Sequence, residues 1–434
     1  MITPAEFARR RRELMRMAGD SAALVVAAAP RRMRNADAAW PYRQDSDFHY
    51  LTGFPEPDAV LALLPGRGRG EVVLFCRERD PERERIDGMR VGPDDAVARF
   101  GVDDAFPVED IDDILPGMLE GRTRLYCHFG RENEFDAQLL RWLRRLRSSR
   151  GGAVVPREFV ALGHLLHELR LYKSPAELAL MRRAASIAAE AQRAAVRAAQ
   201  PGAAEYEVEA ALLQVMRARG AVPSYPPTVA GGVNACVLHY TANQGRLARG
   251  DVLLIDAGAE MACYASDITR TWPVGGRFSA PQRALYEVTH EAQCAAIDEV
   301  RAGRPFNAAH DAAVRVIVRG LCALKLLRGG ARTALKSGEY KRFFPHKTGH
   351  WIGLDVHDVG DYRVDDEPRV LEPGMVVTVE PGIYIPPDDM SVPSKWRGIG
   401  VRIEDDVAVG ARGNEVLTAD LPKDVGAVQA LCAG

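Results

Sequence analysis

The chain has few of the features that mark a secreted, membrane-bound or nucleic-acid-binding protein. Its seven cysteines are odd in number, widely scattered and never spaced Cys-x-x-Cys, which argues against a disulfide framework or a zinc ribbon. No run of about 18 apolar residues occurs, and the N-terminal segment is charged where a signal peptide needs an apolar core. Because 57 basic residues balance 59 acidic residues, no overall attraction to polyanions is expected. These absences predict a cytoplasmic protein that binds neither nucleic acid nor membrane.

The common nucleotide-binding and hydrolase motifs are also missing. The sequence contains no G-x-x-x-x-G-K-[ST], no G-x-G-x-x-G, no G-x-S-x-G and no H-E-x-x-H. A nucleotide-binding loop, a serine-hydrolase turn and a helical zinc-protease motif therefore lose support. What remains is a chain of 434 residues, 47% hydrophobic and 27% charged, which is long enough for two or three packed domains.

The first part of the chain alternates short apolar runs with turn residues. The runs AALVVAAA, FHYLTGF, AVLALL and EVVLFC, between residues 21 and 77, predict the strands of a sheet. Apolar residues between Phe135 and Leu146 recur at helical spacing, and the arginines among them predict a solvated helix face rather than an RNA-binding patch. A break at Gly151-Gly152, a strand-like AVV and a further helix follow. We predict an N-terminal α/β domain over residues 1–173.

The second part opens with a helix start signal. Ser174-Pro-Ala-Glu177 combines an N-cap, a proline at the first helical position and the glutamate of a capping box. The helix that follows ends at Pro201-Gly202. Beyond it we expect a helix, a strand-rich region, two helices and a second strand-rich region, over residues 204–219, 225–272, 280–301, 308–327 and 346–409. Residues 174–434 are therefore predicted to form a second domain that mixes helices and strands.

Two apolar strands end or begin at aspartates. Val252-Leu-Leu-Ile255 runs directly into Asp256-Ala-Gly258, and Asp267 opens the β-branched run Asp267-Ile-Thr-Arg-Thr-Trp272. The two runs can pair as a hairpin, which would bring the carboxylates of Asp256 and Asp267 face to face. An unpaired carboxylate at a buried strand end is costly, so both positions need a partner.

Two later strands carry glutamates in the same manner. Met375-Val-Val-Thr-Val379 leads into Glu380. The run from Ile399 onward alternates, so that Arg402, Glu404 and Asp406 share one face. Buried acids in this number need cations.

Histidines lie near these acids in the sequence and point to a metal site. His346 and His350 are four residues apart, and His357 follows an apolar run. Carboxylates with imidazole form an oxygen-rich site that suits Mn²⁺ and its neighbours better than a thiolate-held zinc. Two divalent ions would balance the charges, share a water that becomes hydroxide near neutral pH, and polarise a substrate carbonyl. This arrangement predicts metal-assisted hydrolysis.

Each residue also has a simpler structural interpretation, which the spacing leaves open. The simpler contacts are a turn cap by Asp256, ion pairs Asp267–Arg270 and Glu404–Arg402, and neutralisation of a nearby arginine by Glu380. The histidines could be satisfied core residues. His346 and His350 could also hold a single metal from one helix, although Gly349 disfavours a helix there.

Several motifs, taken together and in order, resemble one known family. They are His239-Tyr-Thr, Ile255-Asp-Ala-Gly258, Asp267-Ile-Thr-Arg-Thr271, His346 with Gly349-His350-Trp-Ile-Gly-Leu-Asp-Val-His357-Asp-Val-Gly360, Thr378-Val-Glu-Pro-Gly382 and Gly398-Ile-Gly-Val-Arg-Ile-Glu-Asp405. Their order, residue types and spacings resemble the Xaa-Pro aminopeptidases (aminopeptidase P), which are pita-bread metallopeptidases. The segment from Tyr42 to Phe54 resembles the N-terminal domain of the same family, so the resemblance covers nearly the whole chain.

The resemblance implies a fold and a metal centre. The fold is α/β (α+β), with a creatinase-like N-terminal domain followed by a pita-bread domain whose curved, mainly antiparallel sheet is flanked by helices. Two divalent ions are implied, Mn²⁺ first and Co²⁺ or Zn²⁺ as alternatives. The implied ligands are Asp256, Asp267, His350, Glu380 and Glu404, of which Asp267 and Glu404 span both ions.

The resemblance also implies a reaction. A metal-bridging hydroxide attacks the bond before proline and releases the N-terminal residue of a peptide substrate. Glu380 is also the implied acid and base. His239 and His357 contact substrate and stabilise the oxyanion, while His346 and Arg402 match positions that either support the metal ligands or recognise substrate. The expected assembly is a homodimer or homotetramer.

Four alternatives and one departure accompany the resemblance. Prolidase, which cleaves only Xaa-Pro dipeptides, shares the fold and ligands, and a non-catalytic pita-bread binding protein is a further alternative. Methionine aminopeptidase lacks the large N-terminal domain, and creatinase lacks the metals, so both are disfavoured. Ile86 stands where the family often has tryptophan, which bears on substrate length and subunit arrangement.

Overall fold

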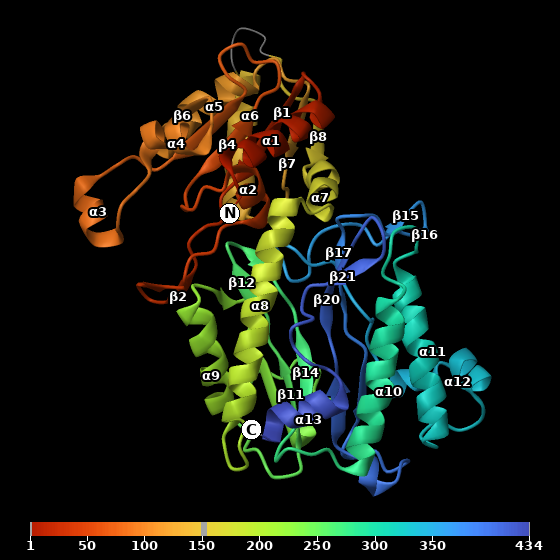
Figure 1. Cartoon of the computed structure of the whole chain (residues 1–434). Coiled ribbons are helices and arrows are strands. Elements are labelled where there is room, and N and C mark those ends of the chain that lie inside the picture. Colours follow the sequence, from red (N-terminus) through yellow and green to blue (C-terminus); the bar gives the residue numbers. More distant parts are fainter. Residues whose placement is uncertain (1, 149–153, 434) are drawn as a thin grey trace. The chain divides into compact units, whose positions relative to one another are not determined.

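The computed structural model describes residues 2–148 and 154–433 and divides the chain into two compact units. Contacts group Met1–Arg170 into the first unit and Leu171–Gly434 into the second (Figure 1). The domain boundary predicted after residue 173 lies close to this division and stays a proposal. The predicted break at Gly151-Gly152 lies outside the described residues.

The first unit is built on one mixed sheet of six strands. Their spatial order is β6-β5-β4-β1-β7-β8, with β1 antiparallel to β4 and parallel to β7. The strands of this unit are β1 (Ala22–Ala27), β2 (Met33–Asn35), β3 (Ala38–Ala39), β4 (Val60–Leu63), β5 (Val72–Cys76), β6 (Asp104–Pro107), β7 (Arg124–Cys127) and β8 (Glu158–Ala161). The three runs predicted as strands around β1, β4 and β5 are confirmed.

Seven helices lie in the first unit among the described residues, and α5 and α6 contribute to the apolar core of its sheet. They are α1 (Pro4–Ala18), α2 (Ser46–Thr52), α3 (Pro81–Asp87), α4 (Gly92–Phe100), α5 (Ile111–Leu119), α6 (Asn133–Ser148) and α7 (Gly163–Leu171). The helix predicted between Phe135 and Leu146 is confirmed as α6, which buries Leu139, Trp142 and Leu143 in the core. Helix α3 buries none of its residues, and Ile86 is 77% exposed there.

Two strand predictions in this unit are wrong. The run FHYLTGF forms helix α2, because Asp45 caps it by accepting a hydrogen bond from the Phe48 amide and Gly53 ends it in the left-handed region. These caps make the run helical, because the spacing of its apolar residues fits a helix and a strand equally well. For the predicted strand over 153–155, residue 153 lies outside the described residues, and Val154 and Val155 are not in a strand.

Helices α8, α9, α10 and α11 of the second unit begin within about one residue of the predicted starts, whereas α12 and α13 were not predicted. Ser174 and Glu177 form a capping box at the start of α8, and Ser279 and Gln282 form another at the start of α10. The helices are α8 (Pro175–Ala198), α9 (Glu205–Ala218), α10 (Ala280–Ile297), α11 (Asn307–Ala323), α12 (Ala331–Ser337) and α13 (Val425–Ala433). Helices α8 and α9 pack side by side, as do α10 and α11 (Figure 1).

The strands of the second unit form short, antiparallel ladders. They are β9 (Val222–Pro223), β10 (Thr228–Gly231), β11 (Val252–Asp256), β12 (Ala259–Met261), β13 (Tyr264–Ala265), β14 (Thr269–Pro273), β15 (Arg363–Val364), β16 (Glu367–Pro368), β17 (Val376–Val379), β18 (Gly382–Ile385), β19 (Ile399–Arg402), β20 (Asp405–Val409) and β21 (Asn414–Val416). The ladders that matter below are β10-β11-β14, β17-β20-β21 and β18-β19. The pairing predicted between the two aspartate-bearing runs is confirmed, with Asp256 opposite Thr269.

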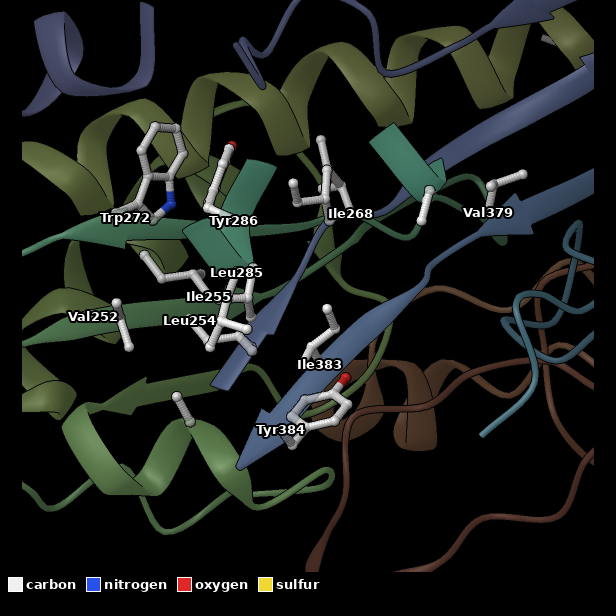
Figure 2. Packing of buried hydrophobic residues seen from close by; sticks show 14 of the residues in the cluster. Val252, Leu254, Ile255, Ile268, Trp272, Leu285, Tyr286, Val379, Ile383 and Tyr384 are labelled. Atoms are coloured by element: carbon white, nitrogen blue, oxygen red, sulfur yellow. The ribbon is translucent and has the colours of Figure 1, made fainter. Parts of the chain in front are cut away.

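A single apolar cluster holds these strands together. Figure 2 shows Leu254 and Ile255 of β11, Trp272 of β14 and Leu285 of α10 packed with Ile383 of β18. All five are at most 1% exposed. Because the strands are fixed by this core, the residues at their ends are carried to defined positions. Within 2–148 and 154–433, no helix is both long and apolar enough to cross a membrane.

A buried ion pair fastens the start of the second unit to a loop. Lys173 Nζ lies 2.9 Å from Asp358 Oδ2, and each side chain is 1% exposed. The Lys173 amide donates to the carbonyl of Gly374 at 2.8 Å. A Cβ on Gly353 would lie 2.2 Å from Asp358 Oδ2, so only glycine fits against the pair. The loop anchored here directly follows His357.

We expect Lys173→Met to lower the free energy of unfolding by about 3–5 kcal/mol, because the buried Asp358 carboxylate loses the ammonium that pairs with it. The control is Arg182→Met, whose partner Glu415 is 49% exposed, and which should cost less than about 1 kcal/mol. Urea denaturation measures both changes. Equal losses in the two variants would contradict this account of the Lys173–Asp358 pair.

Candidate metal centre and active site

The two aspartates meet because of the pairing of β11 with β14. Asp256 is the last residue of β11, and Asp267 lies just before β14. The hydroxyl oxygen of Tyr225 lies 2.6 Å from Asp256 Oδ1 and 2.5 Å from Asp267 Oδ1, so its one proton is shared between the two carboxylates. The backbone amide of Asp267 donates to Asp406 Oδ2 at 3.0 Å. The two carboxylates are thus held on either side of one phenol.

The two glutamates reach the same place from the neighbouring ladder. Glu380 follows β17 and Glu404 precedes β20, and these strands pair with Val379 opposite Asp405. The hydroxyl of Thr269 donates to Glu404 Oε2 at 2.6 Å, which joins this ladder to β14.

His350 completes the cluster from a loop. Residues 346–350 are not helical, and the Thr378 amide donates to the His350 carbonyl at 2.9 Å. The imidazole Nε2 lies 3.5 Å from Asp267 Oδ2 and 3.7 Å from Glu380 Oε1. Asp267, His350 and Glu404 each offer one ligand atom, and these atoms lie within 4.8 Å of one another. The separation and donor types fit a divalent cation.

The charges of the cluster are out of balance. Burial raises the pKa of Glu380 to about 7 and raises that of Glu404 well above its ordinary range. Burial raises the pKa of Asp256 as well, against the opposing charge of Arg402. Burial also acts on Asp267, but the hydrogen bond and charge of His350 keep its pKa below the ordinary value. Several carboxylates therefore hold protons unless cations are supplied, which fits a metal site.

Arg402 supplies one fixed positive charge and starts a chain of contacts. Its Nη2 donates to Asp256 Oδ2 at 2.6 Å, and its Nη1 donates to the Tyr384 hydroxyl at 3.0 Å. That hydroxyl lies 3.0 Å from His346 Nε2, while His346 Nδ1 lies 2.7 Å from the Lys347 carbonyl oxygen. Burial lowers the pKa of His346 to about 4, so the imidazole is neutral at pH 7.

All the residues predicted for the site line one cavity of about 1300 Å³ in the second unit. They are Asp256, Asp267, His350, Glu380, Glu404, His239, His357, His346 and Arg402. The ring of His357 lies 4.2 Å from that of His350, edge to face. His239 lies on an exposed loop after the short 3-10 helix η2 (Gly232–Cys236). The roles of these residues in binding metal or substrate stay predictions.

Two of the simpler interpretations are wrong. Arg270 pairs with Asp405 at 2.7 Å, with both side chains fully buried, and not with Asp267. Arg402 donates to Asp256 rather than to Glu404. Arg270 therefore pairs outside the cluster, while Arg402 balances one acid of the cluster, Asp256. The single-metal helix over 346–350 is also excluded, since no helix forms there.

Three site residues were missed from the sequence. Tyr225, Thr269 and Tyr384 hold the carboxylates and His346 through their hydroxyls. Thr269 lies two residues after Asp267 on the same strand face, which is a signal that could have found it. No pattern marks Tyr225 and Tyr384, because their partners are distant in the sequence.

Comparison with known proteins identifies both units. A model of metallopeptidase family M24 matches residues 179–411, and a model of the aminopeptidase P N-terminal domain matches residues 7–126. The Xaa-Pro aminopeptidase of Haemophilus influenzae is 42% identical, over 98% of this chain and 96% of that relative.

Solved structures agree along the whole chain. A Pseudomonas aeruginosa aminopeptidase superimposes with a TM-score of 0.99 at 55% identity, covering 100% of this chain and 98% of that one. Escherichia coli aminopeptidase P with the inhibitor Pro-Leu gives a TM-score of 0.96 at 41% identity, covering 99% of this chain and 98% of that one. The predicted fold class is confirmed.

We expect metal binding to release at least about one proton per chain at pH 7. The hydrogen bond and charge of Asp267, opposed by burial, raise the pKa of His350 to about 9, so its imidazole carries a proton that must leave before it can ligate. The affinity for Mn²⁺ should therefore rise with pH up to about 9. Calorimetric titration in buffers of different ionisation enthalpy counts the protons. Binding without proton release would contradict the charge imbalance described above.

Proposed function

Since this chain belongs to metallopeptidase family M24 and, within it, to the Xaa-Pro aminopeptidases, we propose that it releases the first residue of peptides whose second residue is proline. The observation that carries the proposal is the meeting of ligand-type side chains in one buried cluster that opens into the cavity. These side chains are Asp256, Asp267, His350, Glu380 and Glu404. Such a cluster suits metal-assisted hydrolysis rather than simple structural packing.

The five side chains would hold two divalent ions, with Asp267 and Glu404 spanning both. The donor set is four carboxylates and one imidazole, which favours Mn²⁺, with Co²⁺ and Zn²⁺ as alternatives. When bound, the ions lower the pKa of a shared water and polarise the carbonyl of the bond to be cleaved. The Tyr225 hydroxyl, placed between Asp256 and Asp267, and the Thr269 hydroxyl, which donates to Glu404, orient the ligand oxygens.

Glu380 handles the proton. Its carboxylate takes the proton of the attacking water and delivers it to the leaving proline nitrogen. Its Oε2 lies 4.0 Å from His346 Nδ1, so the carboxylate lies beside a residue proposed to recognise substrate.

Histidines and Arg402 bind and orient the substrate. His239 and His357 line the cavity next to the cluster and donate to the developing oxyanion. Arg402 fixes Asp256 and, through Tyr384, the ring of His346. This chain of contacts ties substrate recognition by His346 to the geometry of the metal ligands.

The proline preference follows from the chemistry of the bond. An Xaa-Pro nitrogen carries a ring in place of its hydrogen, so a site that needs an N–H donor cannot use it. The cavity also offers apolar walls, including Leu238, Phe306 and Leu371, against which a proline ring can pack. The inhibitor of the Escherichia coli relative, Pro-Leu, begins with proline, as would the product released here from a peptide Xaa-Pro-Leu.

Three finer proposals accompany the activity. We propose a cytoplasmic location, an assembly into a homodimer or homotetramer, and a domain boundary after residue 173 that separates the N-terminal domain from the catalytic domain. The boundary lies three residues from the division of the chain after Arg170, and no nucleic-acid or membrane partner is proposed.

The test is hydrolysis of an Xaa-Pro-Yaa tripeptide beside an Xaa-Pro dipeptide and an Xaa-Ala-Yaa control. We expect the first residue to be released from the proline tripeptide alone or preferentially, with loss of activity after chelation and recovery with Mn²⁺. Cleavage confined to the dipeptide would identify a prolidase instead. Bound metal without any cleavage would identify a non-catalytic binding protein.

A matched pair of variants examines the proton carrier in the same assay. Glu380→Gln should lower kcat about 10²–10⁴-fold, because an amide cannot transfer the proton. Glu190→Gln is the control, since Glu190 lies on α8 and pairs with Arg219 at an exposed site. Wild-type kcat in Glu380→Gln would rule out the role given to Glu380.

A further inference from the structure

The loop that carries His239 has little regular structure of its own. Between β10 and β11, over residues 232–251, the chain forms the short helix η2 (Gly232–Cys236) and an isolated bridge between Arg246 and Ala204, and His239 itself is exposed. Among the residues that the structure describes, His239 makes no side-chain hydrogen bond or ion pair. The position of its imidazole in the cavity therefore depends on whatever holds the backbone of this loop.

One buried carboxylate holds the backbone of the loop that carries His239. Glu205, the first residue of α9, is 1% exposed. Its Oε1 accepts from the Gly231 amide at 2.7 Å and from Asn234 Nδ2 at 2.9 Å. Its Oε2 accepts from the Tyr240 hydroxyl at 2.7 Å and from the Gly245 amide at 2.7 Å. The four donors extend from Gly231, the last residue of β10, to Gly245, beyond His239.

The loop backbone closes tightly around this carboxylate. A Cβ on Gly245 would lie 2.8 Å from Glu205 Oε1, and a Cβ on Gly231 would lie 3.3 Å from the same atom. Glycine is therefore needed at position 245 for the amide to reach the carboxylate. The four donors are uncharged, so what Glu205 supplies is acceptor geometry at two oxygens rather than a salt bridge.

A second contact one helical turn along α9 fixes the far side of the loop. Glu209 Oε2 accepts from Asn243 Nδ2 at 2.9 Å, and Asn243 Oδ1 accepts from the Val229 amide at 3.0 Å. Asn243 lies in the left-handed region with φ 48°. Tyr240, bonded to Glu205, is the neighbour of His239 in the chain. His239 thus lies between anchors that all lead to one face of α9.

We propose that Glu205 is the positioning residue for His239: by accepting from Gly231, Asn234, Tyr240 and Gly245 it holds the loop in the conformation that presents the imidazole to substrate. The inference rests on the proposed function, in which His239 contacts the substrate. Glu205 itself does not line the cavity, but through this contact α9 contributes to the reaction.

The test compares Glu205→Gln, His239→Ala and the double variant with a matched control. An amide offers one acceptor oxygen and places an NH₂ against the amide donors, so at least one anchor is lost. The control is Glu207→Gln, the same change on the same helix, since Glu207 is exposed and caps Ala204 without touching the loop.

We expect Glu205→Gln to lower kcat/KM about 10–100-fold, as a misplaced catalytic contact does. The loss should divide between kcat and KM as it does in His239→Ala, and it should nearly vanish when Glu205→Gln is added to His239→Ala. Bound metal should be unchanged. Hydrogen exchange should rise in residues 231–245 in Glu205→Gln and not in Glu207→Gln.

Other outcomes overturn the inference. The same fold-loss in the His239→Ala background would show that Glu205 acts on general stability and not through His239. If Glu205→Gln does not fold, Tyr240→Phe removes one anchor and must show the same dependence on His239, or the inference fails. If the wild type cleaves no Xaa-Pro peptide, the proposed function is what fails, and unchanged exchange in residues 231–245 would then overturn the role of Glu205 separately.

Discussion

The crowding of buried acids at the ends of four strands is the constraint on which the site depends. Asp256, Asp267, Glu380 and Glu404 meet beside one imidazole, and burial raises the pKa of three of these acids. The single guanidinium of Arg402 cannot balance four carboxylates, so the cluster must keep protons or bind cations. The electrostatic cost of the metal-free cluster is the source of its affinity for divalent ions.

The fold tolerates this cost because the surrounding core is rigid. The apolar cluster of Figure 2 fixes β11, β14 and β18, while hydroxyl groups of Tyr225 and Thr269 satisfy ligand oxygens. Behind the cluster, the fully buried pair of Arg270 and Asp405 joins β14 to β20. The positions of the ligand side chains are therefore set by strand register and by hydrogen bonds from neighbouring residues before any ion binds, which is how metal centres are pre-organised.

Sequence patterns predicted the parts of the molecule that are set by local signals. Ser174 predicts the start of α8, and the apolar run before Asp256 predicts β11. The comparisons confirm the family resemblance, and in the structure the residues that the resemblance implied for the site line one cavity. The run FHYLTGF was mistaken for a strand because its caps, not its apolar residues, decide it. Tyr225, Tyr384 and Glu205 escaped prediction since their partners are far away in the sequence, and only the folded chain brings them together.

The central claim is that the buried acids exist to hold two divalent ions, and anomalous diffraction from Mn²⁺-loaded crystals tests it most directly. We expect two anomalous peaks per chain, both among Asp256, Asp267, Glu380 and Glu404, with His350 beside one of them. A cluster without a peak, at a Mn²⁺ concentration that saturates activity, would contradict the account.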